Sequence, residues 1–139
     1  MSTDGEDHVV LRVRSGELAE QGSWIYAWLR LGGERPVVYV GATALHPATR
    51  AWLHLNHAEP EIGRVAAGYP DAAHEDLDVV AVRVPDGVDR PDAKRAAIAL
   101  LEQRGLLSER YFGDAPTAAD AAGVSAAERL VSLIAARAG

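Results

Sequence analysis

The sequence is 139 residues long, 48% of its residues are hydrophobic, and its formal net charge at pH 7 is −6. This length is typical of one domain and suffices to bury a core, while the absence of cysteine excludes disulfides, thiolate nucleophiles and cysteine-ligated zinc. The negative charge argues against binding nucleic acid through a broad positive field, although a small positive cleft is compatible with it.

The N-terminal part of the chain predicts a tail followed by a strand. Residues 1–7 are polar and acidic and predict a disordered tail, ahead of a single domain over residues 8–139. Residues 8–14, HVVLRVR, alternate in part, which predicts a half-buried strand. Residues 15–22 are polar and bounded by glycine, which allows one helical turn.

Two apolar runs joined by a short loop predict an antiparallel hairpin. Residues 23–31 and 36–42 are rich in β-branched and aromatic side chains, which favour strands. The four residues between them include Gly32 and Gly33, and a loop of this length joins neighbouring antiparallel strands.

The rest of the chain predicts helices with one further strand. Pro47 suits the first turn of a helix because it has no amide hydrogen to lose there, and Gly105 follows the end of another helix. In the last helical stretch we expect a break at Gly123 and a cap at Ser125. The expected helices cover residues 47–57, 61–67, 91–104 and 118–138, the strand covers residues 78–85, and loops cover residues 71–76 and 105–117.

The order of these elements is not a regular alternation of strands and helices. It predicts an α+β fold, in which a small, mostly antiparallel central sheet is flanked by helices. The predicted fold also includes an extra N-terminal strand, which counts as a further strand of the core, and a C-terminal helix. Leu130, Leu133 and Ile134 share one side of the last helix, and this side is a candidate homodimer surface.

The sequence also bears on cellular location. No apolar run approaches the roughly 18 residues that a membrane span needs. The N-terminus, MSTDGEDH, is acidic, whereas a secretory signal begins with positive charge. We therefore expect a cytoplasmic protein with no membrane partner.

The four-residue loop predicts the register of the hairpin. Leu31 would lie opposite Pro36, and Tyr26 would lie opposite Gly41. Because side chains alternate along a strand, one face would be aromatic and half open to solvent, and Gly41 would leave a gap there for a substrate or another backbone. The residues of the aromatic face would be Trp24, Tyr26, Trp28 and Tyr39, and those of the core face Ile25, Ala27, Leu29, Val38 and Val40.

The helix that follows adds polar side chains to the aromatic face. Arg50, His54 and His57 are spaced i, i+4 and i+7, so they share one side of the helix. An arginine offers a charged fork for phosphate or carboxylate, and a histidine or phenol can move a proton. The apolar residues expected to pack on the other sides are Leu45, Ala48, Trp52 and Leu55.

This constellation resembles a GIY-YIG nuclease domain over residues 23–104. Ile25-Tyr26 lies thirteen residues before Tyr39 in Tyr39-Val40-Gly41, and Arg50 and His54 follow on a helix. The resemblance implies three antiparallel strands flanked by helices, and hydrolysis of DNA phosphodiester bonds with Mg²⁺ or Mn²⁺ as cofactor.

The resemblance also implies roles for individual residues. Tyr26 would be the base or would position water, and Tyr39 would help to hold the nucleophile or the phosphate. Arg50 would stabilise charge on the phosphate, and His54 would occupy a histidine or tyrosine position one helical turn later. The candidate substrate-binding residues are Trp24, Trp28, Gly41 and His57.

The chain departs from the family at several positions. Trp24 replaces the glycine of the first motif, and Ala97 falls where the family has its metal-binding glutamate. Glu102 lies about 140° further round the helix and Asp92 is also misplaced, so the metal ligand is unknown. The family's later asparagine has no counterpart, because Asn56 is the only asparagine in the chain.

Several functions therefore stay open. An active domain would be a DNA endonuclease, whereas a degenerate one would bind nucleic acid or a protein partner. A third reading is an enzyme that acts on a small phosphorylated or carboxylated substrate. The simpler alternatives are buried tyrosines with satisfied hydroxyls and a surface ion pair at Arg50. A zinc site at His54 and His57 would lack a visible third ligand.

Overall fold

A computed structural model describes residues 10, 12–18, 22–117 and 124–138 of the chain. Within these ranges the strands are β1 (Val13–Arg14), β2 (Glu17–Leu18), β3 (Trp24–Arg30), β4 (Val37–Thr43) and β5 (Leu77–Arg83). The helices are α1 (Pro47–Asn56), α2 (Arg64–Gly68), α3 (Arg90–Gln103) and α4 (Val124–Ala138), and a 3₁₀ helix, η1, covers Pro70–His74.

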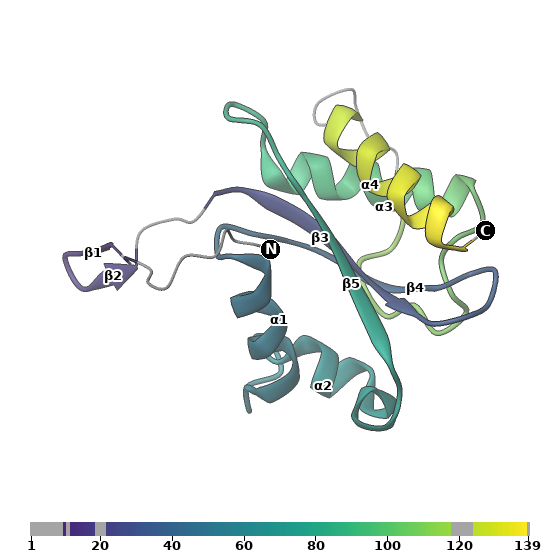
Figure 1. Cartoon of the computed structure of the whole chain (residues 1–139), viewed down its shortest axis with the longest axis horizontal. Coiled ribbons are helices and arrows are strands. Elements are labelled where there is room, and N and C mark those ends of the chain that lie inside the picture. The colour runs from purple at the N-terminus through teal and green to yellow at the C-terminus, as the bar shows by residue number, and fades with distance from the viewer. Residues whose placement is uncertain (1–9, 11, 19–21, 118–123, 139) are drawn as a thin grey trace.

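The architecture is α+β, as the element order predicts. β3 lies at the centre of a three-stranded antiparallel sheet in the order β4-β3-β5. Helices α3 and α4 cover one face of this sheet, and α1 and α2 lie on the other (Figure 1). None of the helices in the described ranges is long and apolar enough to cross a membrane.

The predicted helices lie close to their expected positions. The second begins at Arg64, three residues later than expected, and the expected acidic loop contains η1. The expected break at Gly123 lies outside the described residues. Ser125 was expected to cap this helix but lies inside α4.

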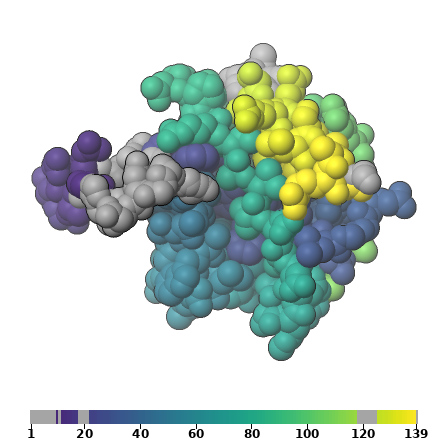
Figure 2. Space-filling view, viewed as in Figure 1, coloured from purple at the N-terminus to yellow at the C-terminus, as the bar shows by residue number. Residues whose placement is uncertain are grey.

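The N-terminal strand is shorter than predicted and does not join the sheet. β1 pairs only with β2, through a turn in which Ser15 and Gly16 have φ of 53° and 79°. The helical turn that residues 15–22 allow does not form over residues 15–18, which belong to this hairpin. This small hairpin stands at one side of the molecule, away from α4 (Figure 2). Residues 8, 9 and 11 of the predicted strand lie outside the described ranges.

The hairpin register is confirmed in its outer half and wrong near the turn. Trp28 pairs with Tyr39, as expected, but Leu29 then pairs with Val37, so that Val38 forms a bulge. The bulge turns the Val38 side chain to the aromatic face instead of the aliphatic one. Leu31 consequently does not face Pro36, and residues 31–36 form a longer turn.

Both faces of the sheet are covered, so the expected half-open aromatic surface is wrong. On one face, aliphatic side chains of β3, β4 and β5 pack against α3 and α4. On the opposite face, Val65 of α2 and Tyr69 complete a second core, and both are at most 2% exposed. The sheet residues of this second core are Tyr26, Trp28, Val38 and Tyr39, and we refer to it as the aromatic core.

The last helix uses its apolar side inside the chain. Leu130 and Ile134 are fully buried in the core with α3, whereas Leu133 is 40% exposed. Two of the three residues named for a homodimer surface are thus unavailable to a partner. The homodimer stays a prediction.

Candidate functional site

His54 lies at the centre of the aromatic core. Its side chain has no exposed surface, although it is carried by α1 at the periphery of the fold. Its ring packs edge-on against three aromatic rings, with centroid distances of 5.2 Å to Tyr39, 5.6 Å to Tyr26 and 5.7 Å to Trp28. This histidine therefore serves as the core residue that fixes α1 to the sheet.

A short hydrogen bond joins His54 to Tyr26. The Tyr26 hydroxyl lies 2.6 Å from His54 Nε2. Burial, with smaller contributions from Arg50 and Arg64, lowers the pKa of His54 to about 3. Burial, and next the neighbouring Tyr39, raise the pKa of Tyr26 above its ordinary value. Both groups are therefore neutral at pH 7.

Arg50 lies beside this pair and is held by the segment that precedes α2. Its Nη1 donates to the Ile62 carbonyl at 2.9 Å. The charge of Arg50 opposes the rise in the pKa of Tyr26 and adds to the lowering of the pKa of His54.

Tyr39 lies beside this group and is slightly more exposed to solvent than Tyr26. It is 6% exposed, and its ring stacks on Phe112 with a centroid distance of 4.9 Å. The Arg64 guanidinium lies 5.7 Å from the centre of the same ring. Burial raises the pKa of Tyr39, and the positive charges of Arg64 and Arg50 oppose this shift.

Sequence reasoning missed Arg64 and Phe112. Arg64 is exposed at the start of α2, yet its charge acts on Tyr26, Tyr39 and His54. Phe112 lies in a segment without periodicity, so no pattern marks it as a neighbour of Tyr39. Arg64 falls in the middle of the helix predicted over residues 61–67, and its spacing does not connect it to Arg50 or His54.

An ion pair joins α3 to the segment that follows Phe112. Lys94 Nζ lies 2.7 Å from a carboxylate oxygen of the exposed Asp114. The hydrogen bond from Lys94 lowers the pKa of Asp114, and the charge of Arg64 acts in the same direction. The charge of Asp114 adds slightly to the rise in the pKa of Tyr39.

The structure brings Tyr26, Tyr39, Arg50 and His54 together, as the sequence predicts, and Trp28 joins them. The other three candidates do not take their expected places. Trp24 lies under the Arg83 guanidinium at 4.7 Å, beside His46, and is not part of the aromatic core. The expected gap at Gly41 is wrong, because the Tyr26 ring and hydroxyl fill the space where a Cβ would be.

His57 does not share the face of Arg50 and His54. The helix ends at Asn56, and His57 follows it with an extended backbone. Its Nδ1 accepts a hydrogen bond from the Glu59 amide at 3.1 Å. The i+7 spacing therefore does not place His57 beside Arg50 and His54, because His57 lies outside the helix.

The expected packing of Trp52 and Leu55 is also wrong. Their side chains are 61% and 44% exposed, and Ala48, one turn earlier, is exposed as well. The reason is that α1 turns Ala51 and His54 towards the sheet. The most apolar side of the helix then points outward.

The donor set does not match a divalent cation. The described residues bring no three side chains of His, Cys, Asp or Glu together in a way that could hold a metal ion. Ala97 is fully buried in the aliphatic core, on the opposite face of the sheet from His54. Asp92 pairs with Arg95, and Glu102 is exposed.

No family model, no curated protein and no solved structure matches the chain.

Proposed function

We propose that this chain is a GIY-YIG-like domain that binds DNA through its phosphodiester backbone without cleaving it. The observation that supports this proposal is the burial of the central phenol. Tyr26 is 3% exposed, and its hydroxyl is hydrogen-bonded to the fully buried His54. A phenol in this position cannot approach a substrate or a hydrolytic water.

The cationic groups, in contrast, lie at the outer side of the site. Arg50 is half-buried and Arg64 is exposed, and the two come from different helices. Arg50 donates to the carbonyl of Ile62, two residues before Arg64, and the Arg64 guanidinium lies 5.7 Å from the centre of the Tyr39 ring. Both positive charges therefore belong to the same side of the site. Guanidinium groups match the geometry of phosphate oxygens, which makes them suitable for backbone binding.

The overall charge limits how such a domain would bind. With a net charge of −6, long-range attraction to DNA is weak, and binding must come from local contacts. Two phosphate contacts would give a slope of about −2 when the logarithm of affinity is plotted against the logarithm of salt concentration.

A metal-dependent endonuclease is the second candidate, and one observation favours it. The four residues that carry the resemblance, Tyr26, Tyr39, Arg50 and His54, lie together in the fold, and His54 Nε2 is 2.6 Å from the Tyr26 hydroxyl. The low pKa of His54 and the raised pKa of Tyr26 oppose proton transfer within this pair. The carboxylates of the described residues do not form a cation site, which opposes this candidate.

The test measures DNA binding and cleavage separately. Fluorescence anisotropy with a labelled duplex, at several salt concentrations, would compare the wild type with Arg64→Ala. Arg64 is exposed, so its removal should leave the fold intact. We expect weaker binding and a salt slope smaller by about one unit. Arg129→Ala removes an exposed arginine of α4, on the other side of the sheet, and is the matched control.

The cleavage arm uses supercoiled plasmid with Mg²⁺ or Mn²⁺. We expect no nicking by the wild type. Metal-dependent nicking that Arg50→Ala abolishes would replace the binding proposal with the endonuclease. Equal DNA affinity of the wild type, Arg64→Ala and Arg129→Ala would refute a role of this site in binding.

A further inference from the structure

A separate hollow lies at the tip of the β3–β4 hairpin, outside the aromatic core. It has a volume of about 610 Å³ and forms where the turn over residues 31–36 meets the chain that follows α3. Arg30, Arg35 and Arg104 line it, together with Glu34 and Glu109. We call it the tip hollow. Its size is within the range of small-molecule sites.

Backbone hydrogen bonds hold the walls of the tip hollow in place. The Val37 amide donates to the Leu106 carbonyl at 3.1 Å, and the Ser108 amide donates to the Val37 carbonyl at 2.8 Å. Arg35 adds a side-chain bond from Nε to the Leu107 carbonyl at 2.9 Å. The hollow is therefore formed in advance, and a ligand would not have to order its walls.

Three arginines from three different parts of the chain line the tip hollow. Arg30 ends β3, Arg35 belongs to the turn, and Arg104 follows the last residue of α3. Arg30 is paired with Glu75 at 3.5 Å. Within residues 22–117, neither Arg35 nor Arg104 forms an ion pair. Both arginines thus keep guanidinium hydrogens for an anion.

Two carboxylates, Glu34 and Glu109, give the tip hollow negative as well as positive charge. Glu109 accepts a hydrogen bond from the Ser108 hydroxyl at 3.2 Å. Backbone and Ser108 hydrogen bonds lower the pKa of Glu109, and the charges of Arg30 and Arg35 lower it further. An ionised carboxylate accepts hydrogen bonds only, so it suits the hydroxyl groups of a ligand.

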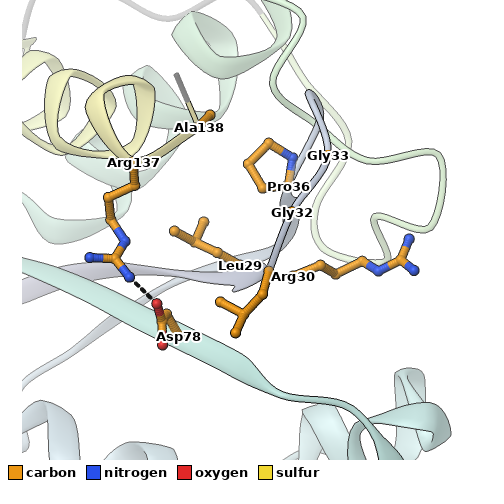
Figure 3. Close-up of a pocket in the computed structure, with 9 residues that line it drawn as sticks. Leu29, Arg30, Gly32, Gly33, Pro36, Asp78, Arg137 and Ala138 are labelled. Carbon is orange, nitrogen blue, oxygen red and sulfur yellow. Dashed lines mark hydrogen bonds and ion pairs between the residues drawn. The ribbon is translucent and has the colours of Figure 1, made fainter.

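A smaller hollow on the other side of the turn is less suited to an anion. It has a volume of about 330 Å³, and its lining includes Leu29, Pro36 and Arg137. Figure 3 shows Arg137 joined to Asp78 across this hollow, whereas the Arg30 side chain points away from it. The Arg137 charge is thus already neutralised within the chain.

We propose that the tip hollow binds a small phosphate ester that also carries hydroxyl groups, such as a nucleotide or a sugar phosphate. The arginine forks would hold the phosphate oxygens in pairs of hydrogen bonds. Glu34 and Glu109 would accept from the hydroxyls and would keep out an extended polyanion such as duplex DNA. The site shares no residue with the tyrosine site, so it does not depend on the function proposed for that site.

The test follows the glycine amides of the wall by NMR. ADP is titrated into the ¹⁵N-labelled full chain, and the amide signals of Gly33 and Gly105 are observed. We expect saturable shifts of both signals with ADP, and weaker binding by about tenfold in Arg104→Gln. Arg137→Gln changes the neighbouring hollow and should bind as the wild type does. Unchanged signals elsewhere would show that the variants are folded.

The remaining arms identify the part of the ligand that is bound. Ribose 5-phosphate tests for a sugar phosphate, and a response to ADP alone would assign a nucleotide. Adenosine lacks the phosphate and should shift neither signal. The proposal is overturned if adenosine binds as well as ADP does. It is also overturned if millimolar ADP and ribose 5-phosphate both leave the two amides unchanged, or if Arg104→Gln binds with unchanged affinity.

Discussion

The two cores on opposite faces of the sheet differ in what they bury. The core against α3 and α4 is made almost wholly of aliphatic side chains, and Ala97, Leu101 and Ile134 are fully buried there. The aromatic core buries atoms that need hydrogen-bond partners. Trp28 Nε1 and His54 Nδ1 are both buried and have no partner within the described part of the chain.

The two faces of the sheet therefore contribute differently to the stability of the fold. Aliphatic burial stabilises without regard to direction, and it grows with the apolar area removed from water. A buried polar group without a partner costs free energy instead. We therefore expect the aliphatic core to supply most of the stability, whereas the aromatic core contains the polar groups of the candidate site.

The largest expected effect is in the aliphatic core. Ile134→Ala removes a fully buried side chain and should lower the free energy of unfolding by about 2–5 kcal/mol. Leu133→Ala, one residue away on the exposed side, is the matched control and should change it by less than about 1 kcal/mol. Urea denaturation measures both. Equal losses would mean that α4 does not depend on its buried side.

The next effect is a dependence of stability on pH that arises from the buried histidine of the aromatic core. The pKa of His54 is about 3 in the fold but near 6.5 in the unfolded chain, so the unfolded state binds the proton first. Stability is fully present above pH 6.5 and falls as the pH falls towards 3, by about 1.4 kcal/mol per pH unit in that window. Urea denaturation between pH 7 and 4.5 should give a smaller slope for His54→Gln. Parallel curves would contradict this.

A smaller effect concerns the pair inside the aromatic core. Tyr26→Phe and His54→Leu each leave one buried group without its partner and should each cost about 1–3 kcal/mol. The double variant should cost less than the sum of the two, because it removes both polar groups together. Strict additivity in thermal or urea unfolding would show that the 2.6 Å hydrogen bond contributes no coupling.

The smallest effect is expected on the outer side of α1. Trp52→Ser removes a side chain that is 61% exposed, and the free energy of unfolding should change by no more than about 0.5 kcal/mol. Ala51→Ser changes the neighbouring residue that faces the sheet and should cost more. A large loss in Trp52→Ser would mean that this indole packs against the fold.

Periodic patterns predicted the elements of the fold but not their environment. Alternation around Tyr26 and Tyr39 placed both on one face, and the helical spacing of Arg50 and His54 placed them beside it. The burial of that face could not be predicted, because it is covered by Val65 and by residues of segments without a clear period. The sequence also offered no sign of the bulge at Val38, which depends on how the turn closes.

The candidate site was predicted to a similar extent. Its four central residues came from spacing alone, whereas the exposed Arg64 and the stacked Phe112 depend on tertiary contacts between distant segments. His57 was misassigned because the helix ends one residue before it. Helix ends are the least predictable part of such a pattern.

The bulge in β4 also determines where this chain can change its length. Val37 faces the aliphatic core and Val38 the aromatic one, although they are neighbours in one strand. Deleting Val38 would force Val37 to the wrong face or shift the pairing of Leu29. The turn over residues 31–36 holds Gly32 and Gly33 in open space, so an added residue there would disturb neither core. Related sequences should therefore vary in length within the turn and keep a constant length between Val37 and Tyr39.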